Sequence, residues 1–240
     1  MDSMLKPIYN STGMCKSIRD YGFQYDENDD PIITDCQKNQ FAIYYLTKES
    51  FTAFDALFTN KMSIQDKFIS YWDHTSAKFA KNPYVVGYDP FNEPLCANPW
   101  KNLFIEVPGV CDRQLLGPLY EKIHEKYMQN DENSVMWFEP PPFPDTLPLA
   151  GGSVVPVGFE KPPGGEFGSI NHALNDHTYC CAVVQEEGVC KDQEPTPEGA
   201  EACMNFHRAK LGTRTADAKR LGIPLFISEF GACFNEGPCT

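Results

Sequence analysis

The pattern of hydrophobic and polar positions changes at residue 63. Beyond it, apolar residues recur at helical spacing in three stretches, and each stretch is followed by a short apolar run that lacks period-two alternation. The pattern predicts helices over about residues 63–81, 115–127 and 197–221, and strands over 84–89, 134–138 and 224–227. Helix-then-strand units in series, with buried strands, predict a parallel sheet covered by helices. The predicted fold class is therefore α/β.

Local signals predict where these helices begin and end. Ser63-Ile64-Gln65-Asp66 matches a capping box, which predicts the first turn of the helix 63–81. Asn82-Pro83 predicts its end, because a residue that precedes proline disfavours the helical conformation. In the last helix, Gly212 marks a candidate break and Gly222 predicts the end.

The segment before residue 63 shows no comparable pattern. Residues 1–62 are expected to form a loop-rich segment that leads into a domain over residues 63–240. A chain of 240 residues is in the size range in which one domain with a sizeable core is usual. The prediction is one domain with long loops.

Charge and hydropathy exclude several classes of function. A net charge of -13 repels phosphate backbones and anionic lipid, so no nucleic-acid partner is expected and a neutral substrate fits better. No run of about 18 apolar residues occurs, so no transmembrane segment is predicted. The first residues, Met1-Asp2-Ser3-Met4-Leu5-Lys6, lack the apolar stretch of a secretory signal.

The cysteine content indicates an oxidising compartment. The chain has 10 cysteines, none of them in a C-x-x-C pair and none near a histidine pair. Disulfides are therefore a stronger interpretation than zinc. This interpretation conflicts with the missing signal peptide.

Two glutamates follow predicted strands and are the candidate catalytic pair. Glu93 lies in Asn92-Glu93-Pro94 beyond the strand 84–89, and Glu229 follows the strand 224–227. In α/β barrels the active site lies at the C-terminal ends of the strands. One carboxylic acid and one carboxylate on opposite sides of an anomeric carbon can hydrolyse a glycosidic bond, and a separation of about 5 to 5.5 Å selects retention of configuration. The alternative is that either glutamate is an ordinary surface charge in an α/β domain whose motifs are accidental, which predicts that the two lie far apart. Carboxyl groups more than about 10 Å apart would fit neither glycosidase geometry.

Other polar and aromatic groups share these strand ends. Asn92 offers an amide to a sugar hydroxyl, Glu139 follows the strand 134–138, and His177 and Tyr179 can reach one substrate from a third strand end. For the histidine and the tyrosine, structural roles in the core are an equal alternative. Three aromatic residues can stack on sugar rings, although core packing is the commoner role of any one of them: Trp100, Trp137 and Phe143.

With these residues in place, the chain resembles glycoside hydrolase family 5, in its endoglycoceramidase-like branch. The most specific stretch is 79–94, which ends in Asn92-Glu93-Pro94. The segments 136–140, 158–165, 177–179 and 225–231 are similar to the family's fifth strand, the loop before its sixth strand, its His-x-Tyr motif and its seventh strand. The match covers about residues 63–234.

The resemblance implies a role for each matched residue. Glu93 is implied as acid/base, Glu229 as nucleophile, Asn92 as partner of the sugar 2-hydroxyl, and Tyr179 as hydrogen-bond partner of the nucleophile. His177, Trp137 and Glu139 complete the expected substrate-binding set. No metal or organic cofactor is expected.

The match also implies a partial (β/α)8 barrel, covering about strands 4 to 7. Strands 1 to 3 have no counterpart before residue 63, and strand 8 would lie beyond Thr240. The chain is therefore expected to be a fragment of a longer enzyme that is secreted or lies in a lysosomal or endomembrane lumen, with its signal peptide on the missing N-terminal side. Alone, it is expected to fold poorly and to be inactive, because its sheet edges are open.

The expected function is that of a retaining β-glycosidase acting on a glycolipid or oligosaccharide by double displacement. Two alternatives stay open. One is a β-glucanase or mannanase of the same family, and the other is a catalytically inactive carbohydrate-binding relative.

Overall fold

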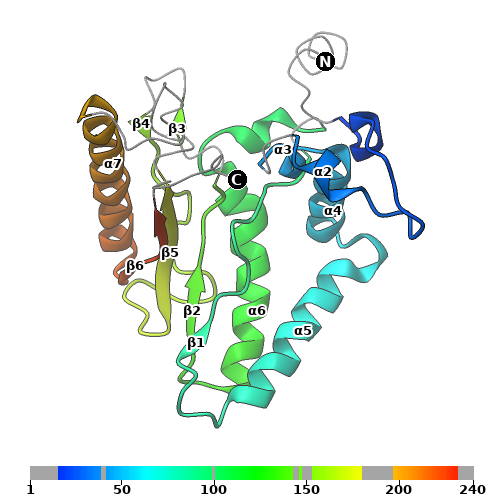
Figure 1. The fold of residues 1–240 in the computed structure, drawn as a ribbon. Helices are drawn as coiled ribbons and strands as arrows, with labels where there is room; N and C mark the ends of the chain where they lie inside the picture. The colour runs from blue at the N-terminus through cyan, green and yellow to red at the C-terminus, as the bar shows by residue number, and fades with distance from the viewer. Residues whose placement is uncertain are drawn as a thin grey trace.

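Four parallel strands form the central sheet of the molecule (Figure 1). The computed structural model describes residues 16–38, 42–98, 101–142, 146–147, 153–179 and 197–231. The sheet has the order β1-β2-β5-β6, with strands β1 (Gly87–Tyr88), β2 (Val135–Phe138), β5 (His172–Tyr179) and β6 (Leu225–Gly231). All three pairings are parallel, as the helix-then-strand pattern predicted.

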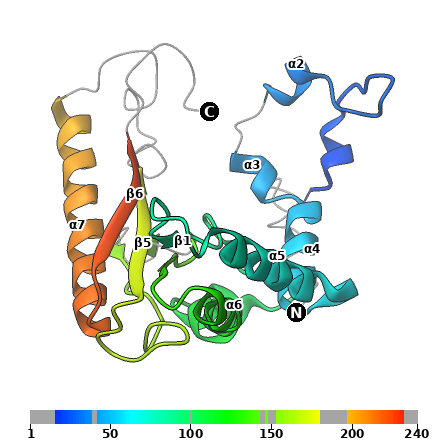
Figure 2. The same ribbon diagram turned by 90° about the horizontal axis from the view of Figure 1, so that it is seen from below.

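Helices cover the sheet and extend from one side of it. They are α2 (Ile33–Cys36), α3 (Ala42–Tyr45), α4 (Lys48–Phe58), α5 (Ile64–Phe79), α6 (Gly117–Asn130) and α7 (Pro197–Leu221). In Figures 1 and 2, α7 lies beside β5 and β6, α5 and α6 lie together near β1 and β2, and α2 to α4 project away from the sheet. Shorter elements are 3-10 turns at Ile18–Tyr21, Lys61–Ser63 and Leu103–Glu106, a π-helical turn at Asp112–Leu116, and the antiparallel strands β3 (Thr146–Leu147) and β4 (Ser153–Val154).

The core lies between α6 and the sheet. Tyr120, Ile123 and Tyr127 follow one another at helical spacing on α6 and are fully buried. They pack with the buried strand residues Met136 and Phe138 in one apolar cluster. In β2 the exposure alternates, so Met136 and Phe138 face this core while Val135 and Trp137 face the opposite side of the sheet.

The structure confirms the α/β class and the predicted helices and strands after residue 63, with changes at their ends. β1 has only two residues, and β6 continues to Gly231, so Glu229 lies within the strand. α7 runs through Gly212 without a break and ends before Gly222, whose φ of 71° is left-handed. The predicted break in this helix at Gly212 was therefore wrong, and its predicted end at Gly222 is confirmed.

The capping box at Ser63 was wrong. Ser63 has a left-handed φ of 58° and its side chain makes no capping hydrogen bond. The cap comes from Asn60, whose Oδ1 accepts from the Asp66 backbone N–H at 3.2 Å and whose Nδ2 donates to the Asp66 carboxylate at 2.9 Å. The exchange of donors resembles a capping box but begins three residues earlier.

The expectation of long loops before residue 63 was wrong for α4, which has 11 residues. Thr47 caps it by accepting a hydrogen bond from the Ser50 backbone N–H at 3.4 Å. Phe51, Phe54 and Phe58 recur at helical spacing along α4, and Phe54 stacks on Phe91 with ring centroids 5.9 Å apart. Both signals were present in the sequence.

Disulfide formation is confirmed in part. Cys96 and Cys111 form a disulfide, and Cys203 is also disulfide-bonded, whereas Cys36 is free. The other six cysteines lie outside the described residues. Within the described part of the chain, no helix has the length and apolar character needed to cross a membrane.

Candidate active site

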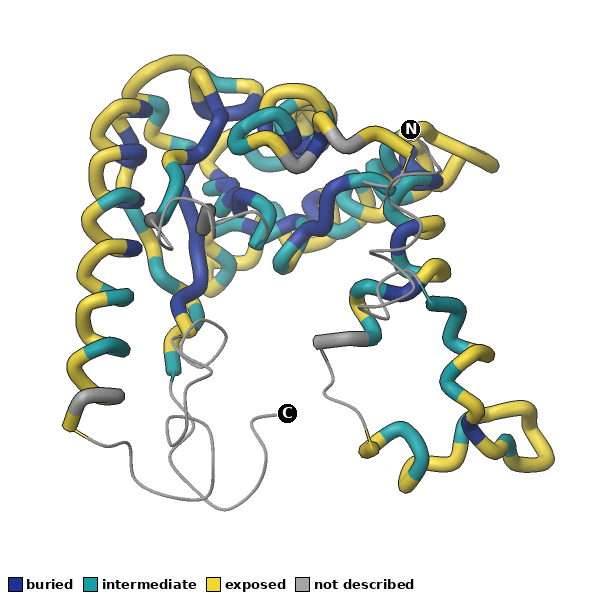
Figure 3. Tube along the Cα trace, turned by 90° about the horizontal axis from the view of Figure 1, so that it is seen from above, coloured by how far each residue is buried: buried dark blue, intermediate teal, exposed yellow. Residues whose placement is uncertain are grey.

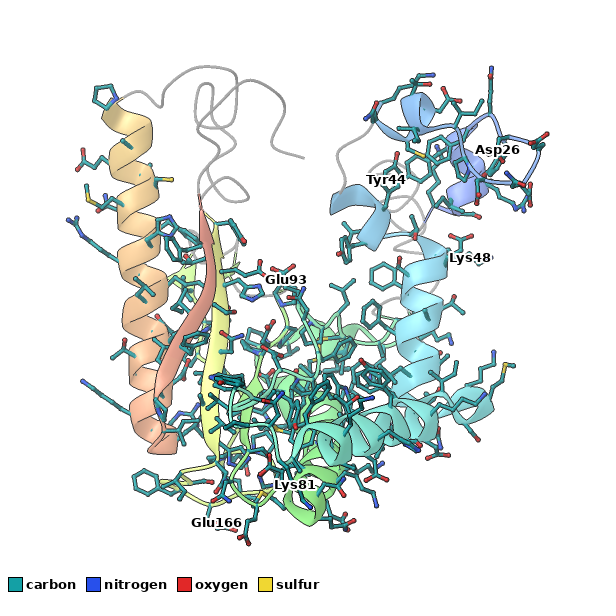
Figure 4. The ribbon with its side chains drawn as sticks, turned by 60° about the horizontal axis from the view of Figure 1, so that its bottom comes forward. Asp26, Tyr44, Lys48, Lys81, Glu93 and Glu166 are labelled. Carbon is teal, nitrogen blue, oxygen red and sulfur yellow. A yellow bond between two sulfur atoms is a disulfide. The ribbon has the colours of Figure 1, made fainter. Side chains whose placement is uncertain are left out.

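Polar side chains from four strands converge at the C-terminal edge of the sheet. Glu93 follows β1, Glu139 follows β2 directly, His177 lies near the end of β5, and Glu229 lies near the end of β6. Because the strands are parallel, these positions fall at one edge. Figure 4 shows Glu93 beside the C-terminal half of β5 and β6.

His177 lies between the two candidate catalytic glutamates. Its Nδ1 is 2.9 Å from Oε1 of Glu93 and 3.6 Å from Oε2 of Glu229. One carboxylate oxygen of Glu93 and one of Glu229 lie within 4.8 Å of each other. This separation is far below the 10 Å limit and close to the spacing of retaining glycosidases.

Hydrogen bonds fix the orientation of Glu229 and His177. The Tyr179 hydroxyl donates to Oε2 of Glu229 at 2.7 Å, and this hydrogen bond, with burial and nearby negative charge, raises the pKa of Tyr179 to about 12. Tyr179 therefore keeps its proton at neutral pH and acts as a donor. On the other side of the imidazole, Nε2 of His177 lies 3.0 Å from Oγ of Ser228.

The acidic surroundings favour the charged form of His177. Burial by itself lowers its pKa, but hydrogen bonds to Glu139 and Glu93 and the charges of Glu139 and Glu229 outweigh it and raise the pKa to about 10. The imidazolium then donates from both ring nitrogens. A cation between two carboxylates also reduces their mutual repulsion.

Glu93 has an unusual backbone conformation. Its φ of 41° is left-handed, and it precedes Pro94, which restricts the residue before it. For a residue other than glycine this conformation costs on the order of 1 kcal/mol or more. The Glu93 backbone N–H donates to Oε2 of Glu139 at 2.8 Å, which offsets part of that cost.

Glu139 lies behind Glu93 and is 3% exposed. Its carboxylate also accepts from Nδ2 of Asn175 at 3.2 Å and lies 3.3 Å from Nε2 of His177. The Tyr120 hydroxyl donates to its backbone oxygen at 3.1 Å. Glu139 therefore holds the site together through these contacts, and its direct contact with a substrate stays a prediction.

The remaining predicted site residues differ in their surroundings. Asn92 is exposed, and its side chain makes no hydrogen bond to the described residues, which leaves its amide available. Trp137 is half-buried and packs against Phe226, with ring centroids 6.2 Å apart. Trp100 and Phe143 lie outside the described residues.

The charged groups behind β5 were not predicted from the sequence. The β5–β6 register shifts between Asp176 and His177, and the Asp176 carboxylate accepts from the His177 backbone N–H at 2.7 Å. The same carboxylate forms ion pairs with Lys210, at 3.2 Å, and with Arg214. All three charged residues are buried. Asp176 thus anchors the irregular part of β5 from which His177 reaches the glutamates.

The three central groups also have the spacing of a cation site. Glu93, His177 and Glu229 each offer a ligand atom, and these atoms all lie within 4.8 Å of one another. Nδ1 of His177 is already hydrogen-bonded to Glu93. The arrangement supports carboxylate catalysis directly, without a further component.

The chain is similar in sequence to proteins named endoglycoceramidase. No family model matches the chain. A protein named endoglycoceramidase from Hydra vulgaris is 32% identical over 209 residues, which cover 86% of this chain and 35% of that protein. Another endoglycoceramidase, from Cyanea nozakii, is 28% identical over 149 residues, which cover 62% of this chain and 28% of its own length.

Solved structures agree in fold. Endo-glycoceramidase II from Rhodococcus sp., in complex with ganglioside GM3, matches with a TM-score of 0.60 at 17% identity, over 85% of this chain and 40% of that one. An endogalactoceramidase matches with a TM-score of 0.55 at 18% identity, over 80% of this chain and 36% of that one. The chain has an endoglycoceramidase-type fold. The four-stranded sheet is accordingly part of a (β/α)8 barrel.

The extent of the similarity corrects one prediction. The chain spans about a third of the length of the curated relatives it matches. The 209 matched residues outnumber the 178 residues of the segment 63–240, so the similarity to the Hydra protein reaches into the segment before residue 63. The endoglycoceramidase-type similarity therefore includes part of the segment that had appeared unrelated.

Proposed function

We propose that this protein acts as a retaining β-glycosidase that cleaves the glycan from a glycolipid. The observation that carries the proposal is the approach of the Glu93 and Glu229 carboxylates to within 4.8 Å at the C-terminal edge of the sheet. Two carboxyl groups at about this distance suit a double displacement, whereas inverting enzymes need roughly 6.5 to 9.5 Å to admit a water molecule.

In this proposal Glu229 is the nucleophile. Its carboxylate attacks the anomeric carbon while Glu93 donates a proton to the departing oxygen, so the glycosidic bond breaks and a glycosyl ester forms on Glu229. Glu93, now ionised, then takes a proton from a water molecule, which attacks the same carbon and releases Glu229. The Tyr179 hydroxyl holds Glu229 in place at 2.7 Å.

His177 supports both steps from between the glutamates. It donates to Glu93 at 2.9 Å and lies 3.6 Å from Glu229, so it stabilises whichever carboxylate is ionised at each stage. Asn92 is the proposed partner of the sugar 2-hydroxyl, and the half-buried Trp137 offers an apolar face to a sugar ring. No metal or organic cofactor takes part in this scheme.

The glycolipid substrate is supported by sequence similarity. Both curated relatives are named endoglycoceramidase, and the Rhodococcus enzyme was solved with ganglioside GM3 and as a lactosyl-enzyme intermediate. A net charge of -13 disfavours binding of the protein to a strongly anionic surface. We therefore propose a substrate whose sugar next to the lipid is neutral. The Cys96–Cys111 disulfide supports a secreted or lumenal location.

The test is release of an oligosaccharide from ganglioside GM3 in detergent micelles, followed by chromatography, with Glu93→Gln, Glu229→Gln and Glu121→Gln variants. Glu121 is exposed on α6 and serves as the matched control. We expect the first two variants to lose at least about 100-fold in turnover and the control to lose none. Turnover unchanged in both site variants would refute the proposal.

Two further measurements define the mechanism and the substrate class. Proton NMR during hydrolysis is expected to show the β-anomer of the released sugar first, whereas the α-anomer first would exclude retention. Cleavage of β-glucan or mannan with no release from GM3 would assign the activity to a polysaccharide hydrolase instead. Activity that is unchanged in EDTA is expected, and loss in EDTA restored by a divalent cation would indicate a metal site at Glu93, His177 and Glu229.

A further inference from the structure

A second pair of carboxyl groups lies directly behind the catalytic pair. Asp89 follows β1, and Glu139 follows β2, the neighbouring strand. Asn175 of β5 donates from its Nδ2 to both of them, at 2.7 Å to Oδ2 of Asp89 and at 3.2 Å to Oε1 of Glu139. Because both carboxyl groups accept from the same Nδ2, they lie close together, and a proton on one of them removes the repulsion between two negative charges.

The contacts of Glu139 extend from this pair to the reacting groups. Oε2 accepts from the Glu93 backbone N–H at 2.8 Å, and Oε1 lies 3.3 Å from Nε2 of His177. Glu139 is therefore the one described carboxylate that touches the main chain of the acid/base and the imidazole beside it. The proposed reaction assigns it no step.

The surroundings determine which of the two carries the proton. Glu139 receives donors from Glu93, Asn175 and His177, which stabilise its ionised form. Asp89 receives donors from Asn175 and from the Phe91 backbone N–H at 3.4 Å. Burial and then the charge of Glu139 raise the pKa of Asp89 to about 7. Asp89 is thus the member of the pair that carries the proton below about pH 7.

Other ionisable groups also face the pair. They are His177 on β5, Glu93 in the loop after β1, and Tyr120 and Tyr127 on α6; Glu229 on β6 faces His177. Burial and the charge of Asp89, with that of Glu139 for Tyr120, keep the pKa of both tyrosines above the ordinary value, so these hydroxyls do not exchange protons with the pair near neutral pH. The charge of His177 is the only positive one among these described groups.

We propose that Asp89 and Glu139 share one proton and act together as a positioning device, in which protonated Asp89 keeps ionised Glu139 on the Glu93 backbone and on His177. When Asp89 loses its proton, two negative charges face each other beside a single Asn175 donor. Glu139 then moves from the Glu93 backbone, whose left-handed conformation it holds. The inference rests on the proposed hydrolysis only for its kinetic test.

The kinetic test compares pH–rate profiles of the wild type, Asp89→Asn, Glu139→Gln and the exposed control Glu125→Gln. Asn at 89 keeps a neutral donor toward Glu139, so we expect a wild-type kcat at pH 5.5 and no decline between pH 6.5 and 8. At pH 8 the variant is then about tenfold faster than the wild type, since one pH unit above a pKa leaves about a tenth of the group protonated. Glu139→Gln is expected to lose about 100-fold in kcat at every pH with little change in KM, because the acid/base is displaced.

A second measurement does not depend on hydrolysis. In protein labelled with 13C at Asp carboxyl carbons, the Asp89 resonance is identified by its absence in Asp89→Asn. We expect it to titrate near pH 7 in the wild type and at lower pH in Glu139→Gln, in which the neighbouring charge is gone. Circular dichroism confirms that each variant is folded.

The outcomes separate this inference from the proposed function. Absence of hydrolysis together with titration near pH 7 refutes the glycosidase and supports the carboxyl pair. Hydrolysis together with titration near pH 4 refutes the pair. A Glu139→Gln variant with wild-type kcat, or an Asp89→Asn variant with the wild-type pH profile, also overturns the positioning role.

Discussion

The ion pairs behind β5 give the sharpest test of how this fold is held together. Arg214 on α7 is 2% exposed and donates to the carboxylates of Asp176 and Asp217 and to the Val155 backbone oxygen, the last at 2.8 Å. Figure 3 shows α7 with its buried positions on the side toward the sheet and its exposed positions outward. The perturbation is Arg214→Met, which keeps an unbranched apolar chain in place of the aliphatic part of the arginine and removes the guanidinium charge.

The magnitude follows from what remains after the change. Removing one partner of a buried ion pair costs roughly 3 to 5 kcal/mol, because the other charge stays buried without compensation. Asp176 keeps Lys210 at 3.2 Å, and Asp217 keeps Arg220 at 3.2 Å and the Val157 backbone N–H at 3.0 Å. The loss is therefore expected near the lower end, about 3 kcal/mol.

The assay is urea unfolding followed by far-ultraviolet circular dichroism at pH 7. The control is Arg208→Met, on the same helix but exposed, with an expected change within about 0.5 kcal/mol. A difference of less than about 1 kcal/mol between the two variants would refute the reasoning, because it would mean that methionine replaces the charged network at little cost.

Three further changes test other parts of the structure. Replacing Cys96 and Cys111 by serine opens a disulfide that joins positions 15 residues apart and should lower the free energy of unfolding by about 3 kcal/mol, whereas an unchanged urea midpoint would contradict this. Gly158→Ala places a Cβ 2.2 Å from the Gly109 backbone oxygen and should destabilise the fold by more than about 2 kcal/mol. Gly212→Ala, in open space on α7, should stabilise it by about 0.5 to 1 kcal/mol. The midpoint temperatures of thermal unfolding of the two variants must therefore shift in opposite directions. Burial raises the pKa of Asp112 to about 6, above its value in the unfolded chain, so the stability that protonated Asp112 contributes is lost as pH rises from about 4 through 6. Asp112→Asn should remove this loss, which amounts to at most about 3 kcal/mol. Urea midpoints measured from pH 4 to 8 check the difference.

The parts of the fold that follow apolar periodicity could be predicted from the sequence. α5, α6 and the strands after them bury apolar residues at regular spacing, and the glutamates follow from strand ends that parallel topology brings to one edge. α4 was within reach, because Thr47 and the phenylalanines of α4 carry the usual signals. The sequence therefore contains enough information to predict α4.

Other features could not be predicted because they depend on partners far apart in the sequence. α7 turns Lys210, Arg214 and Asp217 toward the sheet, and a buried charge is recognisable only once its partner is placed. The register shift at Asp176 depends on the same contacts. Likewise, nothing in Asn92-Glu93-Pro94 reveals that Glu139 lies behind it at 2.8 Å.

The left-handed backbone of Glu93 sets chemistry against stability at a single position. Glycine adopts a φ of 41° without penalty, so a glycine at this position would relax the main chain while removing the carboxyl group. Selection for folding alone would favour that exchange. A glutamate at this position is therefore a local frustration of the fold, sustained by the hydrogen bond from its N–H to Glu139, and a thermostabilising screen without an activity filter would tend to eliminate the very residue proposed to donate the proton.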